Sequence, residues 1–442
     1  MNVHRSALSD EAGASRLGAA EVAAFLSENP NVQYLDCVFV DLCGNVRGKR
    51  IACGELDELF RNGLSIPASI YFLDARGDVV DALAANAGAP GTAWPVAGTL
   101  THVSWAQRPH GQVLMALRDS KGEPYFGEPR NVLRRVVKRF DEFDVAPGVG
   151  IEIDAFIVDR ERGKSGLPQE TTAADGAVWE PIRKDIAIAA EAQALPPLAI
   201  EGGLPRIRIG FAVQGDAVAA ADHVVFLRQV VRAVARNHKR DALFMARPFL
   251  KRAGSSMRVM VDVKRAGESV FSSDSGRDLA RFAAGGLQAL MAESIALFAP
   301  SVNAFRRFSG EAGTARNKRW GYSNASANIS VAVGGDVEPR IEHRVAGADA
   351  NPYLAIAAVL AGVHYGIGQN IDPGQSSDGD VSAFVDPTLP LNIDGALLTL
   401  ENGSVMREYL GPTYVDLYCA TKRTELERFR DFIPAHEYDW YA

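Results

Sequence analysis

Alternating charges make residues 340–354 the part of this chain best suited to chemistry. The segment reads Arg-Ile-Glu-His-Arg-Val-Ala-Gly-Ala-Asp-Ala-Asn-Pro-Tyr-Leu. Side chains of a β-strand alternate between its two faces, so Arg340, Glu342 and Arg344 are predicted to project together. Asn351 is a good N-cap and Pro352 a good first helical residue, so a helix should follow. A charged row held at a strand–helix junction suits a polar active site and equally suits a structural row of ion pairs.

Other predicted strands carry charges at alternating positions in the same way. The residues concerned are Glu152, Asp154, Glu201, Arg206, Arg208 and Arg258. Carboxylates on one face of a sheet usually form a metal site, an acid–base pair or a ladder of ion pairs. The first two interpretations require the strands to converge on one cavity, and residue spacing does not determine that.

Length and composition limit the class of protein. A chain of 442 residues is too long for one compact core, so two or more domains are expected. The net charge of −7, with acids and bases mixed along the chain, predicts no nucleic-acid partner and no anionic membrane partner. The four cysteines show no Cys-x-x-Cys spacing and are expected to be reduced thiols. We find no signal peptide and no apolar stretch long enough to span a bilayer, so a cytoplasmic location is predicted.

Two units are expected, a small one at 17–122 and a large one at 123–442. In the small unit we predict a helix at 20–27 and strands at 32–41, 47–52, 100–105 and 112–117. In the large unit we predict helices after Pro129 and at 222–237, 278–299 and 352–366, with strands at 150–158, 205–211, 256–263, 327–332 and 340–345. Residues 373–390 form a Gly/Ser/Asp-rich loop. Short strands with helices packed on one side indicate an α+β fold.

At this point the residues resemble a known family, the glutamine synthetase superfamily, and in particular its γ-glutamylpolyamine synthetase branch of γ-glutamyl-amine ligases. The resemblance rests on residues 340–354 and on blocks at 41–49, 95–100, 129–133, 243–249 and 300–307. It implies a small β-grasp-like N-terminal domain and a large catalytic-type domain of curved antiparallel sheet and helices. It also implies a homo-oligomeric double ring, usually a dodecamer, with each active site between neighbouring subunits.

The resemblance implies an ATP-dependent reaction in which the γ-carboxylate of glutamate is phosphorylated and an amine then displaces phosphate. Divalent cations held by glutamates and a histidine would neutralise the phosphates. Residues that match the family's functional positions are retained at several places. As metal ligands these are Glu152, Asp154, Glu201 and Glu342; as substrate, nucleotide or catalytic residues they are Gly254, Asn303, Arg307, Glu311, Arg340 and Arg344.

Other family positions have changed. Arg206 and Arg208 stand where the family has a glutamine and a metal-binding glutamate, and Arg258 stands where it has a histidine ligand. Ala325 replaces an arginine that contacts substrate and phosphates. Further departures are Met260, Ser330 and the loop Gly88-Ala89-Pro90. A guanidinium is always charged, pairs with carboxylates in a bidentate manner and cannot ligate a divalent cation.

If the resemblance holds, one metal would have lain among Asp154, Glu201 and Arg208, and the other among Glu152, Arg258 and Glu342. We therefore expect arginine–carboxylate pairs in place of both metals, and no cofactor. The first hypothesis is a pseudoenzyme or repurposed, metal-independent binder or enzyme for a small anionic or amino-acid-like ligand, or a partner of an active paralogue. In the enzyme variant Glu311, Glu152 or Glu342 would act as acid or base. The alternatives are an active ATP-dependent γ-glutamyl–amine ligase, which would require ATP and Mg²⁺ or Mn²⁺, and a purely structural ring protein.

Overall fold

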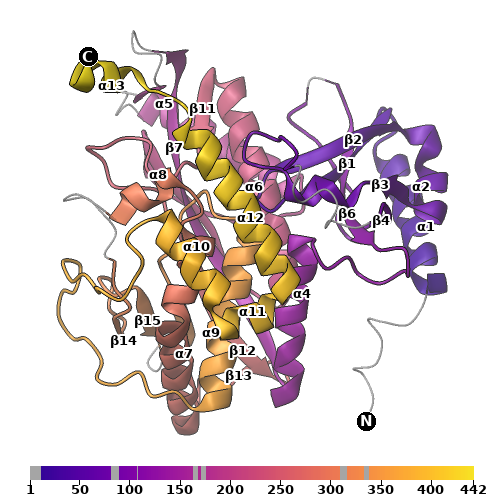
Figure 1. Ribbon diagram of the computed structural model, residues 1–442. Coiled ribbons are helices and arrows are strands. Elements are labelled where there is room, and N and C mark those ends of the chain that lie inside the picture. Colours follow the sequence, from indigo (N-terminus) through magenta and orange to yellow (C-terminus); the bar gives the residue numbers. More distant parts are fainter. Residues whose placement is uncertain are drawn as a thin grey trace.

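Two β-sheets and the helices around them build the chain, as the computed structural model shows (Figure 1). The structure describes residues 11–80, 89–106, 108–162, 168–170, 176–308, 316–332 and 338–442. The predicted α+β class is confirmed, because helices and mostly antiparallel strands alternate along the chain. None of the helices in the described ranges is both long enough and apolar enough to cross a bilayer.

A six-stranded sheet occupies the N-terminal part, with the strand order β2-β1-β6-β4-β3 and with β5 paired to β6. Its strands are β1 (Tyr34–Val40), β2 (Val46–Ala52), β3 (Leu64–Ile66), β4 (Gly91–Pro95), β5 (Thr101–His102) and β6 (Gly111–Arg118). The helices here are α1 (Glu11–Glu28) and α2 (Leu56–Asn62), with 3₁₀ turns at Cys53–Glu55 and Ala68–Phe72. The parallel pairing of β1 with β6 makes this a mixed sheet.

A ten-stranded sheet forms the larger part, in the order β14-β15-β16-β12-β7-β10-β9, with β8 and β11 on β7 and β13 on β12. Its strands are β7 (Ala146–Arg162), β8 (Pro168–Glu170), β9 (Ala199–Gly203), β10 (Arg206–Gln214), β11 (Arg240–Leu243), β12 (Met257–Arg265), β13 (Glu268–Ser269), β14 (Trp320–Tyr322), β15 (Ile329–Ala332) and β16 (Arg340–His343). All its pairings except β14 with β15 are antiparallel.

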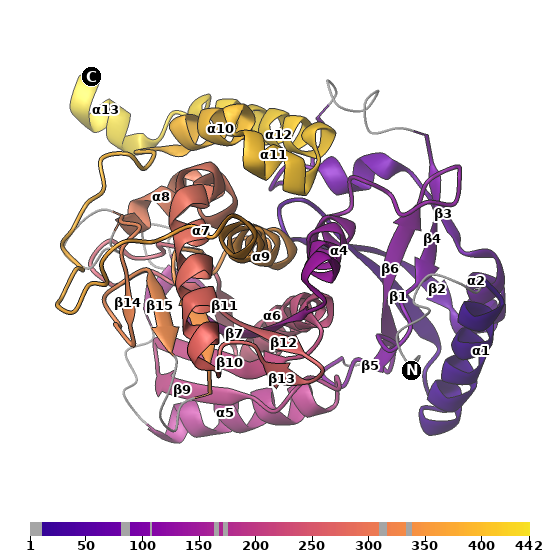
Figure 2. The same cartoon turned by 90° about the horizontal axis from the view of Figure 1, so that it is seen from below.

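The helices of the larger part are not all on one side of this sheet: in Figure 2 two layers lie above it and α5 (Gly176–Glu191) lies below it. They are α4 (Pro129–Arg139), α5 (Gly176–Glu191), α6 (Ala217–Asn237), α7 (Asp274–Phe298), α8 (Val302–Phe305), α9 (Pro352–Gln369), α10 (Ile393–Asn402), α11 (Ser404–Leu410), α12 (Pro412–Arg430) and α13 (Ala435–Tyr441), with 3₁₀ turns at Phe140–Phe143 and Arg306–Phe308. Helices α7 and α9 pack together next to the sheet, and α10, α11 and α12 cover them from outside.

The two faces of the large sheet differ in chemistry because strand side chains alternate. Ile151, Ile153, Val259 and Ile207 are fully buried on one face, with the central helices packed against the sheet. The alternate residues, which include Glu152, Asp154, Arg208 and Arg258, therefore lie on the opposite face. Burial of the apolar face fixes the register and in doing so holds the charged residues together.

The boundaries of several elements differ from the predictions for local reasons. The helix expected from residue 222 begins at Ala217, because the Asp216 carboxylate accepts hydrogen bonds from the backbone N–H groups of Val218 and Ala219. Likewise the helix expected from 278 begins at Asp274, capped by Ser273. The strand expected at 100–105 is only the two residues of β5. Helices α5 and α10–α13 and strand β9 were not predicted as elements.

Candidate functional site

A row of charged side chains crosses three neighbouring strands of the large sheet. In the β-ladder Arg208 of β10 lies opposite Asp154 of β7 on one side and opposite Glu201 of β9 on the other. Residues opposite each other in antiparallel strands project to the same face. The sheet thus brings Asp154 beside Arg208 and Glu201, from which it is separated by more than 40 residues.

Asp154 lies at the β7 end of this row, and its side chain is only 2% exposed. Its Oδ2 accepts from Arg206 Nη2 at 2.7 Å, and its Oδ1 accepts from Arg208 Nε at 3.2 Å. Ser256 donates to Oδ2 twice, from its backbone N–H at 3.0 Å and from its hydroxyl at 2.7 Å. Burial raises the pKa of Asp154, but Arg206, Ser256 and Arg208 outweigh burial and hold the pKa below its ordinary value. The carboxylate is ionised and saturated with donors.

Arg258 of β12 lies opposite Glu152 of the neighbouring strand β7. Its Nη1 lies 3.0 Å from Glu152 Oε2 and 3.7 Å from Glu342 Oε2. Arg208 Nε also approaches Glu152 Oε2, at 3.9 Å. One guanidinium therefore lies between two carboxylates from different strands.

Glu342 has arginines on both sides, as the alternation in residues 340–344 predicts. Arg340 Nε donates to its Oε1 at 3.0 Å, and Arg344 Nη2 donates to its Oε2 at 2.6 Å. Burial raises the pKa of Glu342, but Arg344, Arg258 and Arg340 together hold it below its ordinary value. Arg344 also donates to the backbone carbonyls of Asn324 and Ala325, which ties the end of β16 to the loop between β14 and β15.

Glu201 differs from the other three carboxylates because its side chain is exposed. Within the described parts of the chain it makes no side-chain hydrogen bond or ion pair. Its register opposite Arg208 places it on the charged face, at the side of the sheet formed by β9. The structure therefore groups Glu152, Asp154 and Glu342 with arginines and leaves Glu201 at the margin.

Beneath the charged face lies a second set of predicted residues. Arg307 is fully buried and donates from Nη1 and Nη2 to the carbonyl of Val345, each at 3.1 Å. Burial lowers the pKa of Arg307 to about 10, opposed by Asp349 and Asp154. A Cβ at Gly254 would stand 2.6 Å from both Ala246 O and Arg307 Cγ, so the close approach at this position requires glycine.

Asn303 holds the backbone of Arg247, in the loop that follows β11, through two hydrogen bonds. Its Oδ1 accepts from the backbone N–H of Arg247 at 2.8 Å, and its Nδ2 donates to the carbonyl of Arg247 at 2.9 Å. The predicted catalytic residue Glu311 and the loop glycine Gly88 lie outside the described residues. The roles assigned to these side chains from the family resemblance stay predictions.

Sequence reasoning missed two polar residues that the structure adds to this region. Ser256 was passed over although it precedes Arg258 by two positions and therefore shares its face, a signal that strand alternation could have supplied. Asp349 is buried beside Arg307, accepts from Ser301 Oγ at 3.2 Å, and has its other oxygen without a hydrogen-bond partner within the described structure. No spacing rule would have placed Asp349 there.

Comparison with known proteins agrees with this arrangement of sheets and helices. The family described as "Glutamine synthetase, catalytic domain" matches residues 126–441. The chain belongs to the glutamine synthetase family. It is 32% identical over 443 residues to γ-glutamylputrescine synthetase PuuA of Escherichia coli (strain K12), covering 95% of this chain and 94% of that protein. This similarity places it in the polyamine-ligase branch.

Other members of the glutamine synthetase family are similar over the same length. The glutamine synthetase of Pyrococcus abyssi is 26% identical, covering 95% of each chain, and the glutamate–isopropylamine ligase of a Pseudomonas species is 25% identical, covering 92% of this chain and 94% of that protein. Among solved structures, the one titled "GmaS/ADP complex-Conformation 1" superposes with a TM-score of 0.79 at 22% identity, covering 95% of this chain and 99% of that chain. The predicted glutamine synthetase fold is thereby confirmed.

The charged face does not fit a divalent cation of the kind the family uses. Such a cation needs several oxygen or nitrogen ligands around one open position. Here Arg206 and Arg208 occupy the lone pairs of Asp154, and Arg258 lies between Glu152 and Glu342. Among the described residues no three side chains of His, Cys, Asp or Glu come together as a metal-binding group. What the face offers instead is a set of guanidinium donors, which bind carboxylates and phosphates.

Proposed function

We propose that this member of the γ-glutamylpolyamine synthetase lineage does not carry out ATP-dependent ligation. It is a pseudoenzyme or repurposed protein that binds a small anionic or amino-acid-like ligand at the charged face, with no metal or nucleotide cofactor. The proposal rests on the observation that arginines pair with the carboxylates of the charged face. Arg206 and Arg208 donate to Asp154, and Arg258 lies between Glu152 and Glu342. In the family the corresponding carboxylates would hold metal.

Charge balance on this face supports an anionic ligand. Five guanidinium groups (Arg206, Arg208, Arg258, Arg340 and Arg344) lie on the same face as four carboxylates (Glu152, Asp154, Glu201 and Glu342), which leaves a net charge of +1. Arg206 and Arg208 keep 34% and 35% of their side chains exposed, so both retain donors that a ligand can reach. A cation would be repelled there, whereas a carboxylate or phosphate would gain charge-assisted hydrogen bonds.

An active γ-glutamyl–amine ligase is the second candidate. It is favoured by 32% identity to γ-glutamylputrescine synthetase over nearly the whole chain. It is also favoured by Arg340, Glu342 and Arg344, which match the family and lie together on one strand end. This candidate requires metal to bind despite the arginines, or a rearrangement that moves them away.

One experiment separates the two candidates. Purified protein is incubated with ATP, Mg²⁺ or Mn²⁺, glutamate and either putrescine or another polyamine, and ADP is measured against a reaction without amine. We expect no amine-dependent ADP. In parallel, calorimetric titration with glutamate, glutarate and inorganic phosphate should give saturable binding to at least one of them. Amine-dependent ADP at enzymatic rates would refute the proposal and establish the ligase.

Two variants test whether binding uses the charged face. Arg208→Gln should weaken binding of the anion, because it removes a partly exposed guanidinium and leaves a neutral polar side chain. Arg265→Gln is the matched control, because Arg265 is exposed at the far end of β12 and donates only to the carbonyl of Phe143. Equal binding by both variants would place the ligand elsewhere. Absence of binding by any ligand, together with assembled rings, would favour a purely structural protein.

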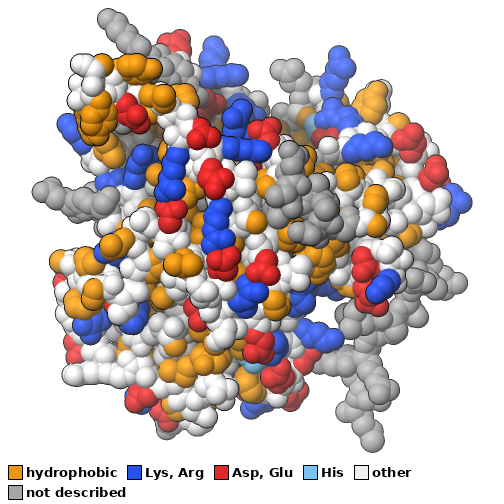
Figure 3. Space-filling view, viewed as in Figure 1, with side chains coloured by type: hydrophobic (Ala, Val, Ile, Leu, Met, Phe, Trp, Pro, Cys, Tyr) orange, Lys and Arg blue, Asp and Glu red, His pale blue; other side chains and the backbone are white. Residues whose placement is uncertain are grey.

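Assembly, partners and location are part of the same proposal. We expect a homo-oligomer of double-ring, dodecamer-like form, in the cytoplasm, possessing the units 17–122 and 123–442, and able to pair with an active paralogue. Exposed aromatic side chains support self-association: hydrophobic groups gather at α13 in the upper left of Figure 3. There Tyr438, Trp440 and Tyr441 are 65%, 72% and 81% exposed. Large exposed apolar groups of this kind mark interaction surfaces, and sedimentation of the purified protein tests the prediction.

A further inference from the structure

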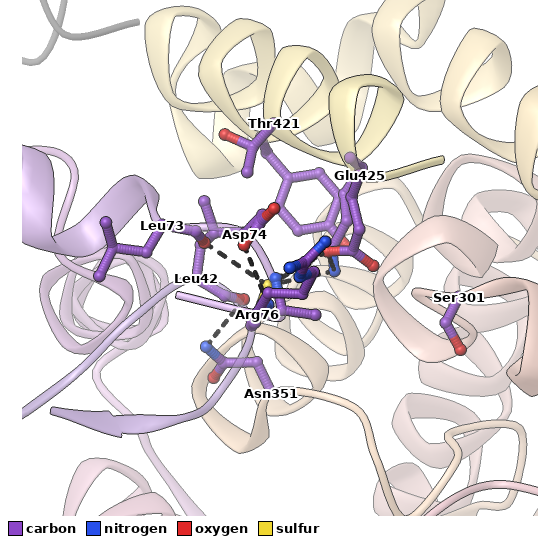
Figure 4. Close-up of polar contacts among 12 residues, drawn as sticks. Leu42, Leu73, Asp74, Arg76, Ser301, Asn351, Thr421 and Glu425 are labelled. Atoms are coloured by element: carbon purple, nitrogen blue, oxygen red, sulfur yellow. Dashed lines mark hydrogen bonds and ion pairs between the residues drawn. The ribbon is translucent and has the colours of Figure 1, made fainter. Parts of the chain in front are cut away.

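A cysteine, a lysine and a glutamate meet where the N-terminal sheet contacts the last long helix (Figure 4). Cys43 lies in the turn between β1 and β2, and Lys422 and Glu425 lie on α12. Lys422 Nζ is 3.3 Å from Cys43 Sγ and 3.1 Å from Glu425 Oε2. Cys43 Sγ is in turn 3.6 Å from the same carboxylate oxygen. Three reactive atoms thus form a compact triangle outside the charged face.

The surrounding contacts hold this triangle in place. Lys422 has a side chain only 4% exposed, so its amine stays beside the sulfur. Glu425 Oε2 also accepts from the backbone N–H of Ala75 at 3.2 Å. The nearby ion pair of Arg428 with Asp74, at 2.6 Å, joins the same helix to the same loop. The amine and the thiol therefore meet through tertiary packing and not through a chance surface contact.

Cys43 is distinct from the other cysteines in this respect. Within the described structure no lysine amine donates to Cys37, Cys53 or Cys419; the thiol of Cys419 instead faces the carbonyl of Leu397. A cavity of about 380 Å³ lies beside the triangle and is lined in part by Asp74, Lys422 and Glu425. It is large enough for a small oxidant such as hydrogen peroxide to approach the triangle.

We propose that Cys43 and Lys422 form an oxidative cross-link through a single bridging oxygen, Sγ–O–Nζ, when the protein meets hydrogen peroxide. In the first step the thiol takes one oxygen from peroxide, giving a sulfenic acid and one water. In the second step that sulfenic acid and the neutral amine lose one hydrogen each, from O–H and N–H, to a second peroxide, which becomes two waters as the O–N bond forms. Cys43 and Lys422 together lose four electrons and two peroxides are reduced, so atoms and electrons balance.

Geometry favours the bridged product. A direct S–N bond would require atoms now 3.3 Å apart to approach much more closely, whereas an inserted oxygen spans most of that gap. Burial raises the pKa of the Cys43 thiol to about 12, opposed by Lys422, so little thiolate forms and the first step is slow. Burial lowers the pKa of Lys422, but Cys43 and Glu425 outweigh burial and raise it, so the ammonium must first lose a proton to solvent and the second step is slow as well. Cys43 and Lys422 react with each other because they lie close together, not because the thiol is acidic.

The consequence is a covalent tie between residues separated by 379 positions. It would fasten the turn after β1 to α12. Because cross-links that close long loops restrict the unfolded chain most, the oxidised protein should unfold at a higher temperature. Reduction by excess dithiothreitol, which supplies four electrons, should return the free thiol, the free amine and the original melting temperature.

Mass spectrometry of the wild-type protein tests the proposal directly. After prolonged treatment with hydrogen peroxide, peptides containing Cys43 and Lys422 should be recovered joined, with the mass of both plus one oxygen and minus two hydrogens. Dithiothreitol should separate them. If the two peptides stay separate and Cys43 is either unmodified or a sulfinic or sulfonic acid, the proposal is wrong. Joined peptides that lack the extra oxygen would show a direct S–N bond and would equally refute the bridged form.

Two variants and an internal control complete the test. Lys422→Arg keeps a cation beside Glu425 but has no amine, so peroxide should leave its peptides unjoined and its melting temperature should not rise. Cys43→Ser should behave in the same way. Cys53, which is half-buried and receives no hydrogen bond from a lysine among the described residues, should oxidise without cross-linking in every protein. If a variant does not fold, the peptide masses of the wild type decide the question alone.

Discussion

Arg208 of β10 lies opposite Asp154 of β7, with Nε 3.2 Å from Oδ1 of a carboxylate whose side chain is 2% exposed. A buried carboxylate is costly unless it is neutralised and hydrogen-bonded. Arg208, with Arg206 and Ser256, supplies both requirements. The Asp154 carboxylate is therefore neutralised and hydrogen-bonded by neighbouring residues of the same chain.

Restoring ligands should restore cation binding. In a variant with Arg206→Gln, Arg208→Glu and Arg258→His, a carboxylate and an imidazole replace guanidinium groups on the sheet face. We expect Mn²⁺ to bind roughly tenfold or more tightly than to the wild type, because oxygen and nitrogen ligands replace repelling charges. Paramagnetic resonance titration of free Mn²⁺ measures this. Arg265→His, on β12 but outside the face, serves as the control. Equal Mn²⁺ uptake by wild type and variant would contradict the idea that the arginines exclude metal.

Asp154→Asn should destabilise the protein by about 3 kcal/mol at neutral pH, because two guanidinium groups lose their buried partner. Since the pKa of Asp154 is lowered in the folded state, its stabilising contribution is present above the ordinary pKa and is lost as the pH falls through the folded pKa. The difference between wild type and variant should therefore shrink in acid. Urea unfolding at several pH values measures both effects.

Asp159→Asn provides a control on the same strand. Asp159 pairs with Arg240, but its side chain is 31% exposed, so the loss should be under about 1 kcal/mol. If Asp154→Asn loses no more stability than Asp159→Asn, water replaces the carboxylate as the hydrogen-bond partner of Arg206 and Arg208 at no extra cost.

Glu128→Gln should change how stability depends on pH. Burial raises the pKa of Glu128 to about 7, opposed by the N–H of Leu117 and the charge of Arg130. Between the ordinary pKa of 4.5 and about 7 the folded state holds the proton more tightly, so this residue's contribution to stability falls as the pH rises. Relative to wild type, the variant should gain on the order of 2–3 kcal/mol between pH ~5 and ~8.

The measurement is the free energy of unfolding at the two pH values. Glu123→Gln, at an exposed position, should leave the wild-type pH dependence unchanged. If Glu128→Gln shows the same pH dependence as wild type, the carboxyl group is not held neutral by burial.

Asn351 has two separable tasks. Its Oδ1 caps α9 by accepting from Tyr353 and Leu354, while its Nδ2 donates to the carbonyls of Asp41 and Leu42 in the N-terminal part. Asn351→Ala should cost about 2–3 kcal/mol, through loss of the cap and of buried hydrogen bonds.

Asn351→Asp keeps the cap but loses the donor, so it separates the two tasks by thermal and urea unfolding. Asn392→Ala removes a single cap bond at α10 and should cost about 1 kcal/mol. Equal losses for Asn351→Ala and Asn392→Ala would mean that the contact with the N-terminal part contributes nothing.

Local sequence signals predicted much of this protein correctly. Strand alternation predicted that Arg340, Glu342 and Arg344 share a face, and the structure joins them by hydrogen bonds. The Asn351-Pro352 pair predicted the start of α9, with Asn351 as its cap. These predictions succeed because they depend on backbone geometry within a few residues. The same reasoning misplaced the starts of α6 and α7, where Asp216 and Ser273 offered earlier caps.

Residue spacing did not determine which charges meet; the family resemblance suggested the groups, and the tertiary structure decided the contacts. The sequence determined the residue types, the faces they occupy and the family to which they belong. Only the pairing of β9, β10, β7, β12 and β16 brought Arg208 to Asp154 and Arg258 between Glu152 and Glu342, while Glu201 remained exposed. The same holds for Cys43 and Lys422, 379 residues apart. Such contacts depend on strand order and long-range packing, which the burial of distant apolar residues selects and which no local spacing encodes.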